Sequence, residues 1–171
     1  MIGRLGMDVS TFYALFSATC FTLVGLWWTV VQKHEAWLRS RAGRRDIGGI
    51  YLSFLLPALM GLFAQVGGTT NPLIWRVSFV AVALIGCWST LRLLQRSRAD
   101  GDAGTFARHR WIAVVIYAVI AVLGVVPEIV KPIGVTPLQA EATLLILLVA
   151  LAHWLVWEFM THGEPAPDPR T

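Results

Sequence analysis

The chain has 171 residues, of which 56% are hydrophobic and 14% are charged, with a formal net charge of +4. This balance excludes an ordinary soluble domain and predicts an integral membrane protein. The basic residues lie in short segments between apolar runs, where the positive-inside bias explains them, so nucleic-acid binding is not expected. Arginine outnumbers lysine by 12 to 2, which is typical of a GC-rich bacterial genome.

The first apolar run, residues 11–32, carries no formal charge and is long enough to cross a bilayer as a helix. We predict an uncleaved span over 11–31, because only a basic segment follows it. Its small and weakly polar residues recur at steps of three and four. They predict one helix-packing face, formed by Ala14, Ala18, Thr22, Gly25 and Thr29. We therefore expect this helix to be buried against its neighbours.

The second span, predicted over 48–66, follows a connector with five Lys or Arg residues between positions 32 and 46. Pro57 near its centre predicts a kink and a backbone carbonyl without its usual partner, which a neighbouring helix or water must satisfy. The third span, 73–94, has Arg76 near its start and Arg92 at its end. These two side chains can extend to opposite membrane interfaces.

The fourth span, predicted over 111–130, places Tyr117 and Glu128 on one helix face. The fifth, 142–160, places His153 and Trp157 on one face. Residues 1–162 therefore form a single transmembrane domain of five helices. The Pro-rich, charged tail 163–171 is predicted to be disordered.

The two basic connectors hold nine Lys or Arg residues, against Arg4 and Lys131 on the other side. The positive-inside rule predicts cytoplasmic connectors, an N-terminus outside and a cytoplasmic C-terminus. The fold class is thus an all-α, five-helix bundle in the cell membrane.

An internal echo relates Gly25–Val30 to Gly86–Leu91, both of which read G-x-W-x-T-aliphatic. One interpretation is a parallel repeat of two helical hairpins followed by a fifth helix. The other, which we favour, is that helices of the same direction acquire small residues and Trp at similar depth.

His153 is the one ionisable residue predicted near mid-membrane. It could relay protons, gate a pore or ligate a metal. We favour a neutral histidine that is hydrogen-bonded to a hydroxyl on an adjacent helix, with Thr29 and Thr90 at suitable depth. Near the outer turn, Glu128, Lys131 and Glu141 form either a solvated rim or a vestibule that attracts cations. The solvated rim is the favoured interpretation.

Cys20 and Cys87 are predicted at depths that differ by roughly 7 Å, so a disulfide is not expected. The sequence has no C-x-x-C, H-E-x-x-H, G-x-S-x-G or phosphate-binding loop motif. We therefore predict no metal and no cofactor, and the patterns lean against enzymatic activity. An intramembrane redox or lipid-modifying enzyme is a third possibility, which a cofactor bound to purified protein would favour.

These patterns favour a non-enzymatic structural, accessory or partner-binding membrane protein. Its expected partners are the lipid bilayer, a second copy in a homo-oligomer, or another membrane protein. The alternative is a small channel or transporter, with a pathway near the first two spans and His153. A continuous polar cavity that reaches His153 would favour this alternative.

Overall fold

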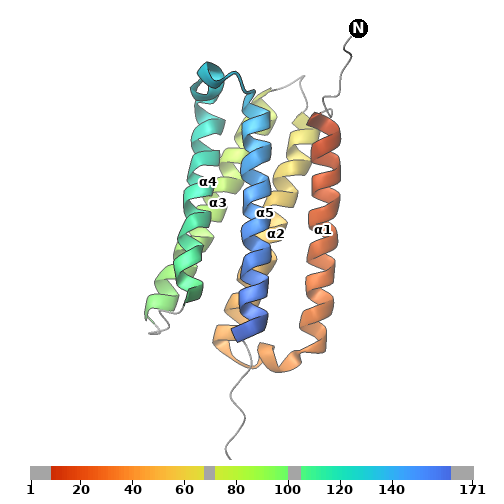
Figure 1. The fold of residues 1–171 in the computed structure, drawn as a ribbon, viewed down its shortest axis with the longest axis vertical. Coiled ribbons are helices and arrows are strands. Elements are labelled where there is room, and N and C mark those ends of the chain that lie inside the picture. The colour runs from red at the N-terminus through yellow and green to blue at the C-terminus, as the bar shows by residue number, and fades with distance from the viewer. Residues whose placement is uncertain (1–8, 68–71, 100–104, 163–171) are drawn as a thin grey trace, which may run out of the picture.

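The computed structural model describes residues 9–67, 72–99 and 105–162, and these ranges contain helices but no strand. The long helices are α1 (Val9–Lys33), α2 (Arg41–Gly67), α3 (Pro72–Ala99), α4 (Thr105–Val125) and α5 (Pro137–His162). Two short 3-10 helices, η1 (Glu35–Leu38) and η2 (Pro127–Ile133), connect them. The helices run up and down in one bundle, in which α2 contacts α1, α3 and α5 (Figure 1). The predicted all-α architecture with five helices is confirmed.

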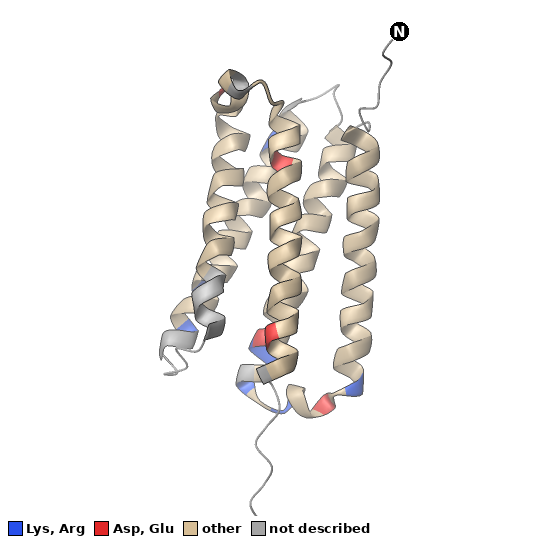
Figure 2. Ribbon diagram, in the orientation of Figure 1, with Lys and Arg blue, Asp and Glu red and all other residues tan. Residues whose placement is uncertain are grey.

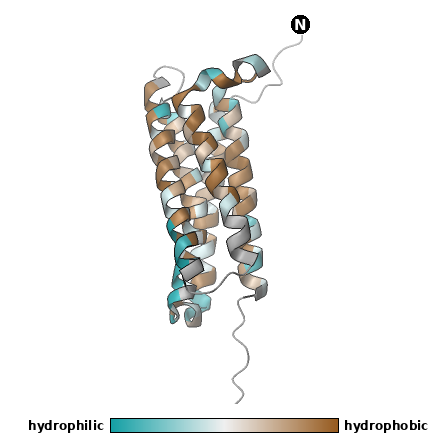
Figure 3. Cartoon of the chain, turned by 90° about the vertical axis from the view of Figure 1, so that its left-hand side faces the viewer, coloured by the Kyte–Doolittle hydropathy of each residue, from teal (hydrophilic) through white to brown (hydrophobic). Residues whose placement is uncertain are grey.

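Four helices are long and apolar enough to cross a membrane: α1 over its whole length, and the stretches Gly43–Gly67, Leu73–Arg96 and Pro137–Thr161. The apolar part of α4, Trp111–Val125, is shorter. Figure 3 shows hydrophobic residues along most of the bundle and hydrophilic residues near its two ends, more of them at the lower end. The chain is therefore a helical membrane protein. Among the residues that the structure describes, four helices meet the length and hydropathy for a span, and a fifth span at α4 stays a prediction.

The connector after α1 is more helical than expected. It contains η1, and α2 begins at Arg41 rather than at residue 48. Ser40 caps this start, because the Gly43 backbone N–H donates to Ser40 Oγ at 2.8 Å. Arg44 and Arg45 therefore lie on a regular helix and not in a loop.

The fourth helix ends at Val125, before the predicted limit of residue 130. Pro127 lacks a backbone N–H, and the chain continues as η2. Arg76 of α3 binds the freed carbonyl groups: its Nε donates to Gly124 O at 2.9 Å and its Nη2 to Val125 O at 2.7 Å. Arg76 therefore caps α4.

The fifth helix begins at Pro137 rather than at residue 142. The Gln139 N–H donates to Thr136 Oγ1 at 3.3 Å, and the Thr136 N–H donates to Gln139 Oε1 at 3.1 Å. This is a capping box, with proline at the first helical position where no N–H is needed.

The buried face of α1 is not the predicted one. The residues buried in the bundle are Tyr13, Ser17, Cys20, Trp27 and Val31. The predicted packing face, Ala14, Ala18, Thr22, Gly25 and Thr29, is exposed, and a Cβ on Gly25 would meet no atom within 4 Å. The face that carries Tyr13 and Trp27 buries more apolar area than the small-residue face. This explains why it is the face that packs against the other helices of the chain. Packing of the small-residue face on another chain stays a prediction.

The interior contains two hydrophobic clusters. One includes Tyr13, Met60, Phe79, Ile120 and Leu145, and the other includes Trp27, Val31, Ile50, Phe54 and Ala152. Pro57 is fully buried in α2, which continues through it to Gly67.

Candidate functional site

Most described charges lie at one end of the bundle (Figure 2), which we call the basic end. It holds the end of α1, η1, the start of α2 and the end of α3. Between α2 and α3 at this end lies a groove of about 460 Å³, the α2–α3 groove. Four arginines line it: Arg44, Arg45, Arg92 and Arg96. Its walls also include Tyr51, Leu52, Trp88 and Leu93.

The helices bring these arginines together from distant parts of the chain. Arg44 and Arg45 lie at the start of α2, whereas Arg92 and Arg96 lie near the end of α3. The second pair is four residues apart, which places both on one helix face. Because α2 and α3 pack together and run in opposite directions, the start of one meets the end of the other. No Asp or Glu is among the described residues that line the groove.

Two of the arginines are held by local contacts. Arg44 Nη1 donates to Leu38 O at 2.9 Å, which ties the start of α2 to the end of η1. Arg45 Nε lies 3.7 Å from Asp46 Oδ1, and these side chains are only 11% and 20% exposed. Arg92 and Arg96 are exposed. Asp46 offsets one charge, so the groove keeps a positive balance.

Beneath the groove lies a narrow cavity of about 40 Å³ between α2, α3, α4 and α5, which we call the inner cavity. It shares Gly49, Leu52, Ser89 and Leu93 with the groove, so the two spaces are adjacent. Since a cavity of about 10–15 Å³ can hold one water molecule, the inner cavity has room for a few.

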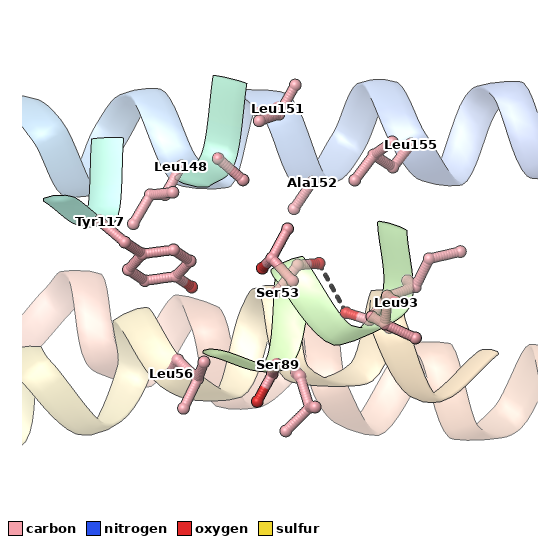
Figure 4. Close-up of a pocket in the computed structure, with 14 residues that line it drawn as sticks. Ser53, Leu56, Ser89, Leu93, Tyr117, Leu148, Leu151, Ala152 and Leu155 are labelled. Atoms are coloured by element: carbon pink, nitrogen blue, oxygen red, sulfur yellow. Dashed lines mark hydrogen bonds between the residues drawn. The ribbon is translucent and has the colours of Figure 1, made fainter. Parts of the chain in front are cut away.

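The lining of the inner cavity is apolar apart from a few hydroxyl groups. Ser53, Ser89, Thr90 and Tyr117 contribute them. Ser53 Oγ donates to Ile50 O at 2.7 Å and Thr90 Oγ1 to Gly86 O at 2.8 Å, so these two are satisfied by their own helices. Figure 4 shows the Tyr117 hydroxyl directed into the space between the helices. Of the predicted candidates, Tyr117 lies in the cavity wall, and Pro57 follows the lining residue Leu56.

His153 lies on the exposed surface of α5 and lines neither the groove nor the inner cavity. Its Nδ1 is 2.8 Å from Val149 O on the same helix, and its ring meets the edge of Phe54 at 5.4 Å between centroids. The predicted partners Thr29 and Thr90 instead donate to Gly25 O and Gly86 O. The nearest polar partner of His153 is thus its own helix backbone.

The remaining candidates lie apart from the groove. Trp157 is 68% exposed on α5, and Glu128 is exposed on η2 at the opposite end of the bundle. The Lys131 side chain and the tail 163–171 lie outside the described parts. The structure therefore does not assemble the five predicted residues into one site.

Glu141 does not lie on the solvated rim where the sequence analysis placed it. It is fully buried in α5, and neither carboxylate oxygen has a hydrogen-bond partner among the described residues. One turn earlier, Leu138 O accepts a hydrogen bond of 2.8 Å from the Tyr13 hydroxyl. The sequence did contain a signal, because Glu141 follows Leu138 and precedes Leu145 and Leu148 at steps of three and four.

Within the described ranges, no group of three or more His, Cys, Asp or Glu side chains could hold a metal ion. Cys20 and Cys87 are both free, as predicted. Cys20 is buried, whereas Cys87 Sγ donates to Val114 O at 3.5 Å.

Comparison with known proteins gave no match: no family model fits the chain, and neither curated proteins nor solved structures showed a similar one. Functional inference for this protein therefore begins from the α2–α3 groove and the inner cavity.

Proposed function

We propose that this chain is a non-enzymatic accessory protein of a bacterial cell membrane, which binds an amphiphilic membrane molecule in the α2–α3 groove. The observation that carries this proposal is the groove itself. It combines aromatic and aliphatic walls with a rim of four arginines, within about 460 Å³.

The walls and the rim suit different parts of one ligand. Leu52 and Leu93 contribute apolar surface to the groove. Trp88 of α3 also lines it and is 68% exposed. Tyr and Trp favour the boundary between hydrocarbon and headgroups, because one end of each side chain is apolar and the other is polar. An amphiphile with its chain on the walls and its polar group at the rim satisfies both surfaces.

The inner cavity is too narrow for an acyl chain, since its volume is about 40 Å³. We therefore place the amphiphile in the groove, where it enters from the membrane side. The inner cavity below it has room for a few water molecules beside the Tyr117 hydroxyl.

The proposed topology places the basic end in the cytoplasm, with the N-terminus outside and α4 as a fifth, shorter span. The nine Lys and Arg residues of the two connectors support this orientation. A groove with arginines at that end would lie at the headgroups of the inner leaflet.

The alternative function is a small channel or transporter. Its support is the hydroxyl groups of the inner cavity. A pathway at His153 gains no support, because that side chain lies on the outer surface of α5.

Gly48 offers a direct test, because it lines the groove and a Cβ added there would meet no atom within 4 Å. Gly48→Leu should fill part of the groove without disturbing α2. We expect it to lower, several-fold, the amount of lipid that copurifies with the protein, as measured by native mass spectrometry.

The matched control is Gly25→Leu, since Gly25 is also helical with open space at its Cβ but lies on the exposed face of α1. This variant should retain lipid as the unchanged protein does. Equal lipid retention in all three proteins would contradict the proposal.

A further inference from the structure

We infer that the α2–α3 groove selects an anionic phosphate headgroup, held by Arg44, Arg45, Arg92 and Arg96. This inference rests on the proposed function and names the chemistry of the molecule bound there.

The first argument is the convergence of charge. Two arginines from the start of α2 and two from the end of α3 line one groove, and no acidic residue is among its described lining. Like charges gathered around one concave space repel each other unless an anion lies between them. A bound anion would convert this repulsion into attraction.

The second argument is the type of cation. All four are arginines, whose planar guanidinium groups donate paired hydrogen bonds that match the oxygens of a phosphate. Arg44 uses one nitrogen on Leu38 O, and an arginine has five N–H donors in total. Its contact with η1 thus fixes the side chain and leaves donors for a ligand.

The third argument concerns the two exposed arginines. Arg92 and Arg96 project from one face of α3 near its end, whereas Arg45 is partly neutralised by Asp46. Arg92 and Arg96 are therefore the arginines whose removal should change ligand selection most and folding least.

The surroundings favour a lipid over a soluble phosphate compound. Tyr51, Leu52, Trp88 and Leu93 lie in the same groove, and they would stay uncovered if a small hydrophilic anion bound alone. Basic pockets between membrane helices are suited to anionic lipid headgroups. A lipid would cover the walls and the rim together.

The test offers delipidated protein equal amounts of phosphatidylglycerol and phosphatidylcholine with identical acyl chains, and counts bound lipids by native mass spectrometry. The two lipids differ in net headgroup charge. We expect the unchanged protein to prefer phosphatidylglycerol by about tenfold, which corresponds to about 1.4 kcal/mol of difference in binding free energy. This is the order expected when one or two basic residues near the membrane surface contact the charged headgroup.

The double variant Arg92→Gln/Arg96→Gln should lose this preference and still bind phosphatidylcholine. The matched control is Arg39→Gln/Arg41→Gln, which removes two exposed arginines of the basic end that do not line the groove. It should keep the preference. Arg92→Lys/Arg96→Lys should keep part of it, because lysine retains the charge but not the paired donors.

The outcomes distinguish failure of the headgroup selectivity from failure of lipid binding in the groove. Equal binding of both lipids by the unchanged protein would overturn the inference and leave the proposed function standing. An equal loss of preference in the control variant would also overturn it, because diffuse surface charge would then explain the selection. Retention of neither lipid would remove the proposed function as well. Displacement of phosphatidylglycerol by millimolar inorganic phosphate would keep the arginine site but assign it to a soluble phosphate.

Discussion

Glu141 is a buried acidic residue that the α2–α3 groove does not use. Its side chain lies in α5, whereas the groove arginines lie in α2 and α3. It is fully buried, and its oxygens have no hydrogen-bond partner in the described ranges. An unpaired carboxyl group is costly in an apolar interior. Its presence at this position therefore weakens the packing of α5 rather than strengthening it.

Replacing Glu141 by leucine should raise stability. Leucine has a similar size and continues the pattern of Leu138, Leu145 and Leu148, so it removes an unsatisfied polar group without leaving a large void. We expect a gain of about 1–3 kcal/mol in the free energy of unfolding, measured by denaturation in detergent micelles. Glu128→Leu, on the exposed surface of η2, should change it little. A loss of stability in Glu141→Leu would mean that the carboxyl group has a partner, such as a bound cation.

Single residues show where sequence patterns succeed and where they fail. The depth of His153 along α5 follows from counting residues, but its direction around the helix depends on which neighbours pack against it. The chain places that face outward, beside Phe54. Glu141 was assigned to the rim from its charge and its distance from the turn, although its spacing from the leucines already indicated the buried face.

Arg76 is the main link between one helix and the end of another. Its guanidinium group donates to two carbonyls at the end of α4 and so takes the place of the missing next turn.

Arg76→Met should lower the free energy of unfolding by about 2 kcal/mol, since it removes two hydrogen bonds from a charged donor. Arg76→Lys should recover part of the loss, because an ammonium group lacks the planar fork. Arg92→Met, on the same helix but exposed, serves as the control for loss of an arginine. Thermal unfolding in lipid-free detergent measures all three. If Arg76→Met and the Arg92→Met control have the same free energy of unfolding, the two hydrogen bonds from Arg76 do not stabilise the fold.

The ends of helices were only partly predictable. Proline and threonine at the start of α5 are strong local signals, and the capping box makes that helix begin earlier than its apolar run. For α1, periodicity correctly separates a small face from a large one. Periodicity does not show which of the two faces the rest of the chain covers. That depends on which other helices can pack against each face.

The charge asymmetry of the bundle predicts its orientation, with the basic end in the cytoplasm. We expect Arg39→Cys at the basic end to react with a membrane-impermeant maleimide only after cells are permeabilised. Val135→Cys, exposed at the opposite end, should react in intact cells. Both variants belong in a Cys20→Ala/Cys87→Ala background. The reverse labelling pattern would place the basic end outside and contradict the positive-inside assignment.

The groove could not have been predicted from the sequence. The basic residues of the two connectors were evident from the sequence, and helices that alternate in direction predict both connectors at one end of the bundle. That Arg45 and Arg92 share one concave surface depends on α2 packing along α3, which requires the three-dimensional arrangement. The same holds for the inner cavity, to which four helices contribute.

The early end of α4 has a consequence for the surrounding bilayer. Its apolar stretch, Trp111–Val125, spans about 22 Å at the helical rise, whereas hydrocarbon is about 30 Å thick. In the proposed topology α4 is the fifth span, so lipids beside it would have to compress to match this stretch, while those beside α1 would not. The protein should therefore carry a thinned patch on one flank, and it should favour membranes or lipid domains whose thickness makes that distortion small.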